Sequence, residues 1–234
     1  MTKIQKLEES YIKNIFESIS KDYDLMNDLI TFKYHSKWKK EIAMIGKEDN
    51  PKVILDIATG TGDIAINLSK LKDSQIIGID ISEKMLGVAG DKIRKMNINN
   101  ITLELSKAEK LKYRNNFFDL ISIGYGVRNF EDLINGLKES YRVLKKNGKL
   151  IILETSVPNN FLIKYLYLLF TSIYIPLISF IFTKNMKAYN YLLDSTKEFP
   201  HEKEFKKILG SVGFKNIASK KKFFGISTIY ILTK

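Results

Sequence analysis

The feature that most restricts the fold of this chain is a glycine-rich turn between a strand-like and a helix-like segment. The apolar, β-branched run Val53 to Ile57 leads into the turn LDIATGTGD, and residues 64–71 behind it carry apolar side chains at helical spacing. Gly60 and Gly62 leave the backbone amides of this turn open to a ligand at the start of the helix. The segment therefore predicts an α/β fold with a ligand bound next to its first strand.

Strand-like and helix-like segments alternate along most of the remaining chain. The expected buried strands are 75–80, 101–105, 119–123 and 149–154, and the expected helices between them are 83–94 and 132–144. This alternation predicts a parallel sheet covered by helices on both faces, with a turn at Asn147-Gly148 before the strand at 149. Strands at 217–224 and 226–232 meet at Gly225 and predict a final antiparallel hairpin.

Two acidic residues indicate which ligand the turn binds. Asp80 ends the second strand, 18 residues after Gly62, where a carboxylate accepts both hydroxyls of a ribose. Asp56, at the end of the first strand, repels a pyrophosphate but suits the cationic end of S-adenosylmethionine. A dinucleotide is the alternative, since Gly60 to Ala65 also satisfies the G-x-G-x-x-G/A pattern. A dehydrogenase-like Tyr-x-x-x-Lys occurs only before the strand at 149, so we interpret it as a coincidence.

Three longer stretches resemble a known family. They are YDLMNDLITFKYHSKW (23–38), GYGVRNFEDLINGLKESYRVLKKNGKLIILETS (124–156) and YLLDSTKEFP (191–200). In these stretches the sequence resembles class I methyltransferases and, more closely, the ubiquinone and menaquinone biosynthesis C-methyltransferases, with residues 126–145 most similar to demethylmenaquinone methyltransferases. The resemblance implies a single S-adenosylmethionine-dependent methyltransferase domain over residues 1–234. It also implies a Rossmann-like, mostly parallel seven-stranded sheet with a C-terminal antiparallel hairpin.

The resemblance also implies a set of residues around the cofactor. They are Asp56, Gly60, Thr61, Gly62, Asp80, Ile81, Lys107, Ala108 and Gly124. Lys107 stands where relatives tend to have Asp or Asn, which leaves a backbone contact from Ala108 in place of a side-chain contact to the adenine. No metal is expected, because the chain has no cysteine and only two histidines.

The implied reaction is methylation of a ring carbon of a demethylated prenyl-quinol, converting demethylmenaquinol to menaquinol. An ionised phenol activates the neighbouring carbon, and a guanidinium stabilises the phenolate, so we expect Arg128 to be the central catalytic residue. A surface ion pair with Glu131 or Asp132 is the alternative role of Arg128. The resemblance adds Asn129 and Tyr23 to the substrate site.

His35 is a candidate general base, because its unperturbed pKa lies near neutrality. Its spacing from Trp38 on an amphipathic segment equally predicts a residue that packs or caps a helix. A water molecule held by Arg128 and Asn129 is the alternative base.

An uncharged apolar stretch, residues 165–183, lies between Lys164 and Lys184. It is near the length that spans a bilayer, but Pro176 and several tyrosines disfavour spanning, as does its position between parts of one sheet. We expect a hydrophobic helical insertion over 157–199 that is buried, forms a homodimer or acts as a lid for a prenyl tail at a membrane. Residues 1–46 are expected to form a helical cap that includes an amphipathic helix over 4–19.

Composition leaves several functions open. The 38 Lys and Arg against 26 Asp and Glu give a net charge of +12, but the lysines are scattered along the chain. We therefore expect no nucleic-acid partner, and the resemblance implies a prenylated quinol substrate. The alternatives are a methyltransferase for the benzoquinol of ubiquinone biosynthesis, for RNA or for another small molecule, and a non-catalytic prenyl-lipid or cofactor-binding module. The first residues lack a secretion signal, so we expect a cytoplasmic protein peripheral to the inner face of the cell membrane.

Overall fold

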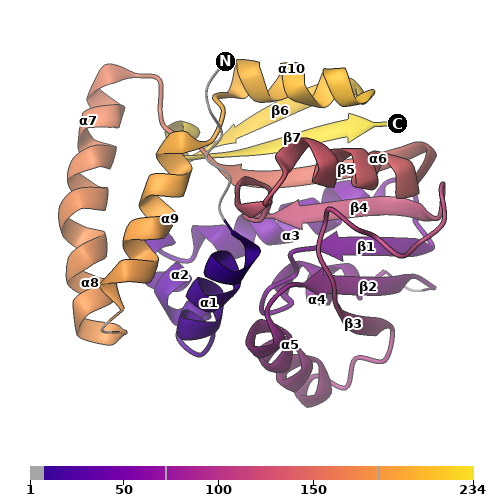
Figure 1. Ribbon diagram of the computed structural model, residues 1–234, viewed down its shortest axis with the longest axis horizontal. Helices are drawn as coiled ribbons and strands as arrows, with labels where there is room; N and C mark the ends of the chain where they lie inside the picture. The colour runs from indigo at the N-terminus through magenta and orange to yellow at the C-terminus, as the bar shows by residue number, and fades with distance from the viewer. Residues whose placement is uncertain (1–7, 72, 184) are drawn as a thin grey trace.

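The computed structural model describes residues 8–71, 73–183 and 185–234, and its centre is one seven-stranded sheet. The strands are β1 (Val53–Ile57), β2 (Gln75–Asp80), β3 (Ile101–Leu105), β4 (Phe118–Gly124), β5 (Leu144–Thr155), β6 (Lys215–Lys222) and β7 (Ser227–Thr233). They lie in the order β3-β2-β1-β4-β5-β7-β6. Strands β1 to β5 pair in parallel, and β7 is antiparallel to both β5 and β6 (Figure 1). This topology confirms the predicted sheet and its final hairpin.

Helices cover both faces of the sheet. The α-helices are α1 (Glu9–Ile19), α2 (Tyr23–Thr31), α3 (Tyr34–Lys47), α4 (Asp63–Leu68), α5 (Glu83–Lys95), α6 (Leu133–Val143), α7 (Phe161–Leu169), α8 (Ile175–Phe182), α9 (Met186–Glu198) and α10 (Glu202–Val212). Helices α6 and α10 pack on one face, and α3 and α4 pack on the other. Alternate residues of β1 accordingly enter different cores, with Leu55 on the α6 side and Ile54 on the α3 side. Both side chains are fully buried, as expected of a central parallel strand.

A third apolar cluster joins segments that lie far apart in the sequence. Helices α1 and α2 from the N-terminal segment pack against α8 and α9, with Ile19, Met26, Ile178 and Tyr189 among the buried contacts. Met85, on α5, also belongs to this cluster. Figure 1 shows these helices together at one end of the sheet, the end at which β1, β2 and β4 terminate.

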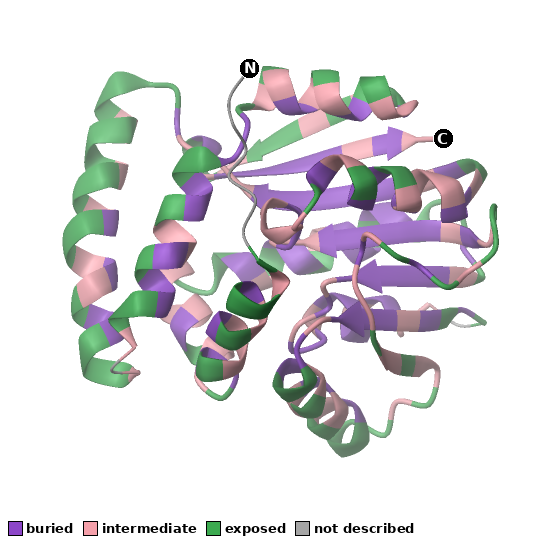
Figure 2. Ribbon diagram, in the orientation of Figure 1, coloured by how far each residue is buried: buried purple, intermediate pink, exposed green. Residues whose placement is uncertain are grey.

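The apolar stretch at 165–183 forms most of one continuous helix, Phe161–Phe182, made of α7, the π-helical turn Phe170–Tyr174 and α8. The helix is long and apolar enough to cross a membrane, but α8 packs against α2 and α9 of the same domain. Its outer side is exposed (Figure 2), so the expectation that this helix is buried was wrong. Pro176 does not interrupt it, because the wider π turn directly before α8 accommodates the missing backbone donor.

Three boundaries differ from the sequence-based expectations. Strand β5 begins at Leu144, and Asn147-Gly148 forms an irregularity within it, because β4 continues to pair with residues on both sides. The β6–β7 connection contains the short 3₁₀ turn Phe223–Gly225, so Gly225 alone does not join the strands. The first described helix begins at Glu9, and the predicted start at residue 4 lies outside the described residues.

Candidate active site

A cavity lies at the carboxyl ends of β1, β2 and β4, where the glycine-rich turn approaches the end of β2. Its lining includes the predicted cofactor residues Gly60, Asp80, Ile81, Lys107, Ala108 and Gly124. The Gly60 amide donates to the Asp80 carboxylate at 2.8 Å, and the Ser82 amide donates to its other oxygen at 2.9 Å. Gly60 has a φ of 56°, in the left-handed region that glycine enters at little cost. Each Asp80 oxygen retains a lone pair, so the carboxylate can accept ribose hydroxyls without losing these bonds.

Other predicted cofactor residues lie outside this lining. The Asp56 carboxylate is 1% exposed and accepts from the hydroxyls of Thr59 and Ser122, each at 2.6 Å. Burial raises the pKa of Asp56 to about 6, although these bonds oppose the shift. Thr61 donates instead to Asp24, and Gly62 is the N-cap of α4, where a Cβ would meet Ala89 at 3.0 Å. The structure therefore does not bring Asp56, Thr61 or Gly62 into contact with the cavity.

The side chain of Lys107 forms ion pairs with two glutamates. Its amine pairs with Glu9 of α1 at 2.6 Å and lies 3.8 Å from Glu131. Glu9 itself lines the cofactor cavity, together with Ile12 and Phe16 of the same helix. The N-terminal helix thus covers the cavity; the sequence predicted a helical cap over residues 1–46 but not which part of the molecule it covers.

A second, largely apolar cavity of about 590 Å³ adjoins the first. Helices α2, α3, α7 and α9 and the β6–β7 turn contribute to its walls, with aromatic and aliphatic side chains such as Phe32, Trp38, Leu166 and Phe170. Tyr23 and Tyr125 line both cavities. The two cavities therefore meet at these tyrosines, at the carboxyl end of β4.

Among the described residues, Arg128 is the only arginine that lines the second cavity. The residue lies in the 3₁₀ turn Val127–Asn129, directly after β4, and its side chain is 6% exposed. One Nη atom donates to Glu154 at 2.5 Å and to the Tyr125 carbonyl at 2.8 Å. Nε donates to the Ser195 hydroxyl at 3.3 Å. The partner of Arg128 is therefore neither Glu131 nor Asp132 but a buried carboxylate on β5.

The Arg128–Glu154 pair provides a permanent cation beside the cavity. Burial alone would lower the pKa of Arg128, but Glu154 reverses the effect and raises it. Among the described residues, the second Nη atom of Arg128 has no protein acceptor, so it is available to an anionic oxygen in the cavity. The signal for Glu154 in the sequence was a lone acid at the end of the apolar strand LIILE, and sequence reasoning missed it.

Asn129 lies next to Arg128 but lines the first cavity. Its side-chain oxygen accepts from the Tyr191 hydroxyl at 2.8 Å, and its amide donates to the Tyr125 carbonyl at 3.3 Å. Tyr191, on α9, thereby fixes the side chain of Asn129 over the 3₁₀ turn. Arg128 and Asn129 therefore face different cavities on the two sides of one turn.

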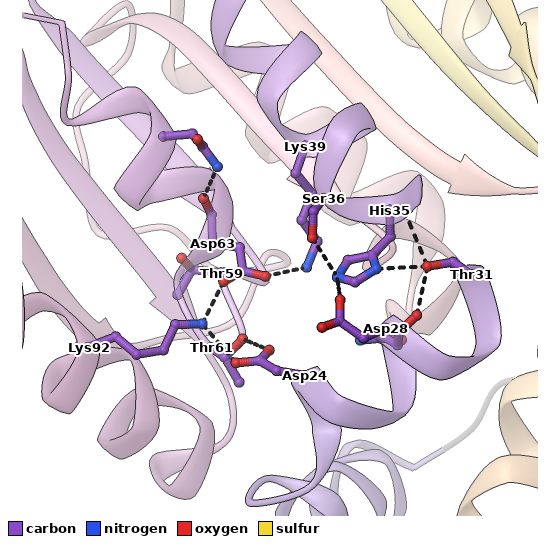
Figure 3. Close-up of polar contacts among 12 residues, drawn as sticks. Asp24, Asp28, Thr31, His35, Ser36, Lys39, Thr59, Thr61, Asp63 and Lys92 are labelled. Carbon is purple, nitrogen blue, oxygen red and sulfur yellow. Dashed lines mark hydrogen bonds and ion pairs between the residues drawn. The ribbon is translucent and has the colours of Figure 1, made fainter. Parts of the chain in front are cut away.

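His35 lines the second cavity but is 3% exposed and already hydrogen-bonded (Figure 3). Its Nδ1 lies 2.8 Å from the Thr31 hydroxyl, and its Nε2 lies 3.2 Å from the Ser36 hydroxyl. Burial is the main cause that lowers the pKa of His35 to about 4, and Lys39 adds to it. His35 is therefore neutral at physiological pH, and its bonds join the end of α2 to the start of α3.

A charged network connects these helices to the glycine-rich turn. Asp63, at the start of α4, lies between Lys39 of α3 and Lys92 of α5 (Figure 3), and Lys92 also bonds Asp24 at 2.8 Å. Burial alone would raise the pKa of Asp63, but the two lysines lower it to about 2. Lys39 is itself 7% exposed, so the carboxylate compensates a buried charge. Sequence reasoning missed this network, because its members come from four separate elements.

The chain matches a model of the ubiE/COQ5 methyltransferase family over residues 4–234. It is 36% identical over 225 residues to a demethylmenaquinone methyltransferase of Bacteroides fragilis, covering 95% of this chain and 92% of that protein. A demethylmenaquinone methyltransferase of Chlorobaculum parvum is 38% identical over 99% of this chain and 95% of its own length. A ubiquinone/menaquinone biosynthesis C-methyltransferase of Geobacter sulfurreducens is 36% identical, over 94% and 86% of the two chains.

Solved structures share the fold at lower sequence identity. A putative S-adenosyl-L-methionine-dependent methyltransferase of Methanococcus maripaludis superimposes with a TM-score of 0.64 at 21% identity, covering 93% of each chain. A phosphoethanolamine N-methyltransferase of Haemonchus contortus, solved in complex with S-adenosyl-L-methionine, has a TM-score of 0.59 at 16% identity, over 78% of this chain and 48% of that one. These likenesses confirm the predicted fold class.

Proposed function

Because this chain belongs to the ubiE/COQ5 methyltransferase family, we propose that it methylates a ring carbon of a demethylated prenyl-quinol, and that this quinol is demethylmenaquinol. Family membership makes the protein an S-adenosylmethionine-dependent methyltransferase, which confirms the predicted cofactor and family. Two of the relatives described above are named for demethylmenaquinone and one for both quinone pathways. The benzoquinol of ubiquinone biosynthesis is therefore the second candidate substrate.

The observation that carries this proposal is the meeting of two unlike cavities at Tyr23 and Tyr125. The first cavity has glycine-rich walls and Asp80, which suit the cofactor. The second is apolar apart from Arg128, His35 and a few hydroxyl and amide groups, which suits an isoprenoid chain with a polar ring at its inner end. A substrate in the second cavity would present its ring to the methyl group of a cofactor in the first.

Arg128 supplies the electrostatic requirement of the reaction. Methyl transfer from the sulfonium to carbon is an in-line displacement, in which a ring carbon gives an electron pair to the methyl group as the methyl–sulfur bond breaks. S-adenosylhomocysteine is the second product, and the ring carbon loses its hydrogen as a proton. Ionising the hydroxyl next to the reacting carbon makes that carbon more nucleophilic. The free Nη atom of Arg128 would stabilise the phenolate, while Glu154 keeps the guanidinium oriented from the opposite side.

The exposed apolar side chains around the second cavity support a peripheral membrane contact. Exposed apolar side chains of α7 and α8, including Phe161 and Phe180, lie on the helix that borders the second cavity, and Phe32 and Phe224 are exposed in its walls. Exposed lysines occur among them, at positions 33, 37, 164 and 221. Apolar groups interspersed with cations fit the anionic inner leaflet of a cell membrane, from which a prenyl-quinol must enter.

Turnover with alternative acceptors tests the function. Labelled S-adenosylmethionine would be supplied with reduced demethylmenaquinone in liposomes, beside a demethylated benzoquinol and bulk RNA. We expect methyl transfer to the naphthoquinol at least tenfold faster than to the others. Equal or faster transfer to the benzoquinol would instead assign the protein to ubiquinone biosynthesis. Cofactor binding without transfer to any acceptor would contradict the proposed reaction.

A further inference from the structure

Tyr125 adopts a backbone conformation that a bulky residue rarely occupies. Its φ is 57°, in the left-handed region, whereas the glycines on both sides, Gly124 and Gly126, have φ values outside that region. These glycines are required for space instead, because a Cβ would meet Ile64 at 2.3 Å at the first position and Ala58 at 2.4 Å at the second. The position at which glycine would relieve the backbone therefore carries a tyrosine. Residues kept in costly backbone conformations cluster at functional sites, which points to a use for this side chain.

Hydrogen bonds hold the backbone of Tyr125 in this conformation. Its amide donates to the Leu153 carbonyl of β5 at 2.7 Å. Its carbonyl accepts from an Nη atom of Arg128 at 2.8 Å and from the side-chain amide of Asn129 at 3.3 Å. Both residues of the 3₁₀ turn that are expected to act on the acceptor are thus bonded to the backbone of Tyr125. The tyrosine side chain therefore has a fixed place beside the guanidinium.

The side chain of Tyr125 extends from the cofactor cavity to the apolar cavity. The flanking residues Gly124 and Gly126 line the first cavity, and the Tyr125 hydroxyl lies 3.4 Å from the hydroxyl of Ser227, which lines the second. Tyr125 itself lines both cavities, and it is only partly buried. It also packs against the apolar core below α3 and α4. The ring therefore forms an accessible wall at the junction, supported by the core of the domain.

We propose that the ring of Tyr125 is the surface against which the aromatic ring of the methyl acceptor packs, and that this contact favours a two-ring over a one-ring acceptor. This inference rests on the proposed function, which makes the acceptor an aromatic quinol. Aromatic rings pair in offset or edge-to-face arrangements and gain more than the burial of their area alone provides. Because Arg128 is bonded to the backbone of the same tyrosine, Tyr125 would orient the acceptor ring while the guanidinium holds one of its oxygens. The reacting carbon would then face the methyl donor.

Replacing Tyr125 by Leu and by Phe tests this contact, because both variants keep an apolar side chain on the same backbone and only Phe keeps the ring. We expect Tyr125→Leu to reduce kcat/KM about tenfold for a short-tailed demethylmenaquinol, but no more than about threefold for the matching demethylated benzoquinol, because the larger ring loses more contact. Tyr125→Phe should stay within about twofold of wild type with both acceptors, because it retains the aromatic face. Calorimetric titration should give an unchanged Kd for S-adenosylmethionine in both variants.

Tyr141→Leu is the matched control. Tyr141 is also a partly buried tyrosine, packed against Phe214 with ring centroids 5.2 Å apart, and it lines neither cavity. Its replacement should leave kcat/KM for both acceptors unchanged. Equal losses with the two acceptors in Tyr125→Leu, or wild-type kinetics in that variant, would overturn the proposal. Equal losses in Tyr125→Leu and Tyr125→Phe would do the same, because the effect would then not depend on the ring.

A binding measurement separates this inference from the proposed function. Trp38, the only tryptophan of the chain, lines the second cavity, so its fluorescence reports a quinone bound there. Short-tailed demethylmenaquinone should bind Tyr125→Leu about tenfold more weakly than wild type, whether or not turnover occurs. If wild type binds the quinone but methylates no quinol, the proposed function is wrong. Equal Kd values for wild type and Tyr125→Leu would show that the ring contact is absent.

Discussion

At the scale of single residues, the proposed function divides the site into groups expected to hold the cofactor and groups expected to act on the acceptor. Asp80 bonds the glycine-rich turn within the first cavity, and Arg128 faces the second. We expect Arg128→Ala to reduce kcat at least 100-fold and to leave the Kd for S-adenosylmethionine within twofold, because the phenolate loses its cation.

Asp80→Ala should raise the Kd for S-adenosylmethionine at least tenfold, because two ribose hydrogen bonds are lost.

Calorimetric titration of S-adenosylmethionine and single-turnover assays measure these two effects separately. A Kd for S-adenosylmethionine that rose equally in both variants would mean that cofactor binding does not depend on Asp80 more than on Arg128. Full activity in both variants would contradict the site assignment as a whole.

His35 should control the acid stability of the protein. Its pKa is about 4 in the folded protein and 6.5 in the unfolded chain, so the unfolded state binds the proton first as the pH falls. The stability that neutral His35 contributes is therefore complete above pH 6.5 and is lost progressively towards pH 4. We expect His35→Gln to reduce this loss by about 1 kcal/mol or more, as measured by urea unfolding at several pH values. His201→Gln, at an exposed position, is the control, and equal pH slopes in wild type and His35→Gln would contradict the prediction.

At the scale of elements, the stability of the site depends on the contact of α3, α4 and α5. Asp63→Asn would leave the buried amine of Lys39 without its carboxylate, and we expect a loss of about 2–3 kcal/mol in the free energy of unfolding. Asp91→Asn breaks the ion pair with Arg94 on the exposed side of α5 and should change stability by less than about 0.5 kcal/mol. Chemical denaturation of both variants tests this, and equal losses would mean that burial of the Lys39 charge has no effect.

At the scale of the whole molecule, we expect the apolar surface of α8 and the β6–β7 turn to determine whether the protein binds membranes. Replacing Phe180, Ile181 and Phe224 together by Ser removes three exposed apolar side chains, and we expect binding to anionic liposomes to weaken at least tenfold. Sedimentation with liposomes measures this binding. Met96, which caps α5, and Leu105, at the end of the edge strand β3, are also exposed, and their replacement by Ser should have no effect.

The same experiment distinguishes a membrane contact from a homodimer. Light scattering of the wild-type protein without lipid should give the mass of one chain. A stable dimer that the triple variant abolishes, together with no liposome binding, would assign this surface to a second copy of the chain.

The sheet and the cofactor turn could be predicted from the sequence because their signals are local. Alternating strand and helix periods specify a parallel sheet, and the order Gly60, Gly62 and Asp80 places a ligand at its carboxyl edge. Each inference needed only neighbouring residues, because backbone periodicity and turn chemistry act over a few positions. Arg128 was proposed instead from the family resemblance and the need of a phenolate for a guanidinium, and the structure places it after β4 in the lining of the second cavity.

The remaining parts of the site depend on contacts between distant segments. Glu154 meets Arg128 because β4 and β5 are neighbours, and Glu9 reaches the first cavity because α1 packs on α5 and α9. Asp56 was assigned to the cofactor from its place near the end of β1, but in the folded chain its carboxylate accepts hydrogen bonds from Thr59 and Ser122. The sequence thus determined the strands, the turn and the family resemblance, because short-range sterics and hydrogen bonding specify them. Only the tertiary structure decided which polar groups are satisfied by the protein and which remain available to a substrate, because burial and pairing depend on the whole chain.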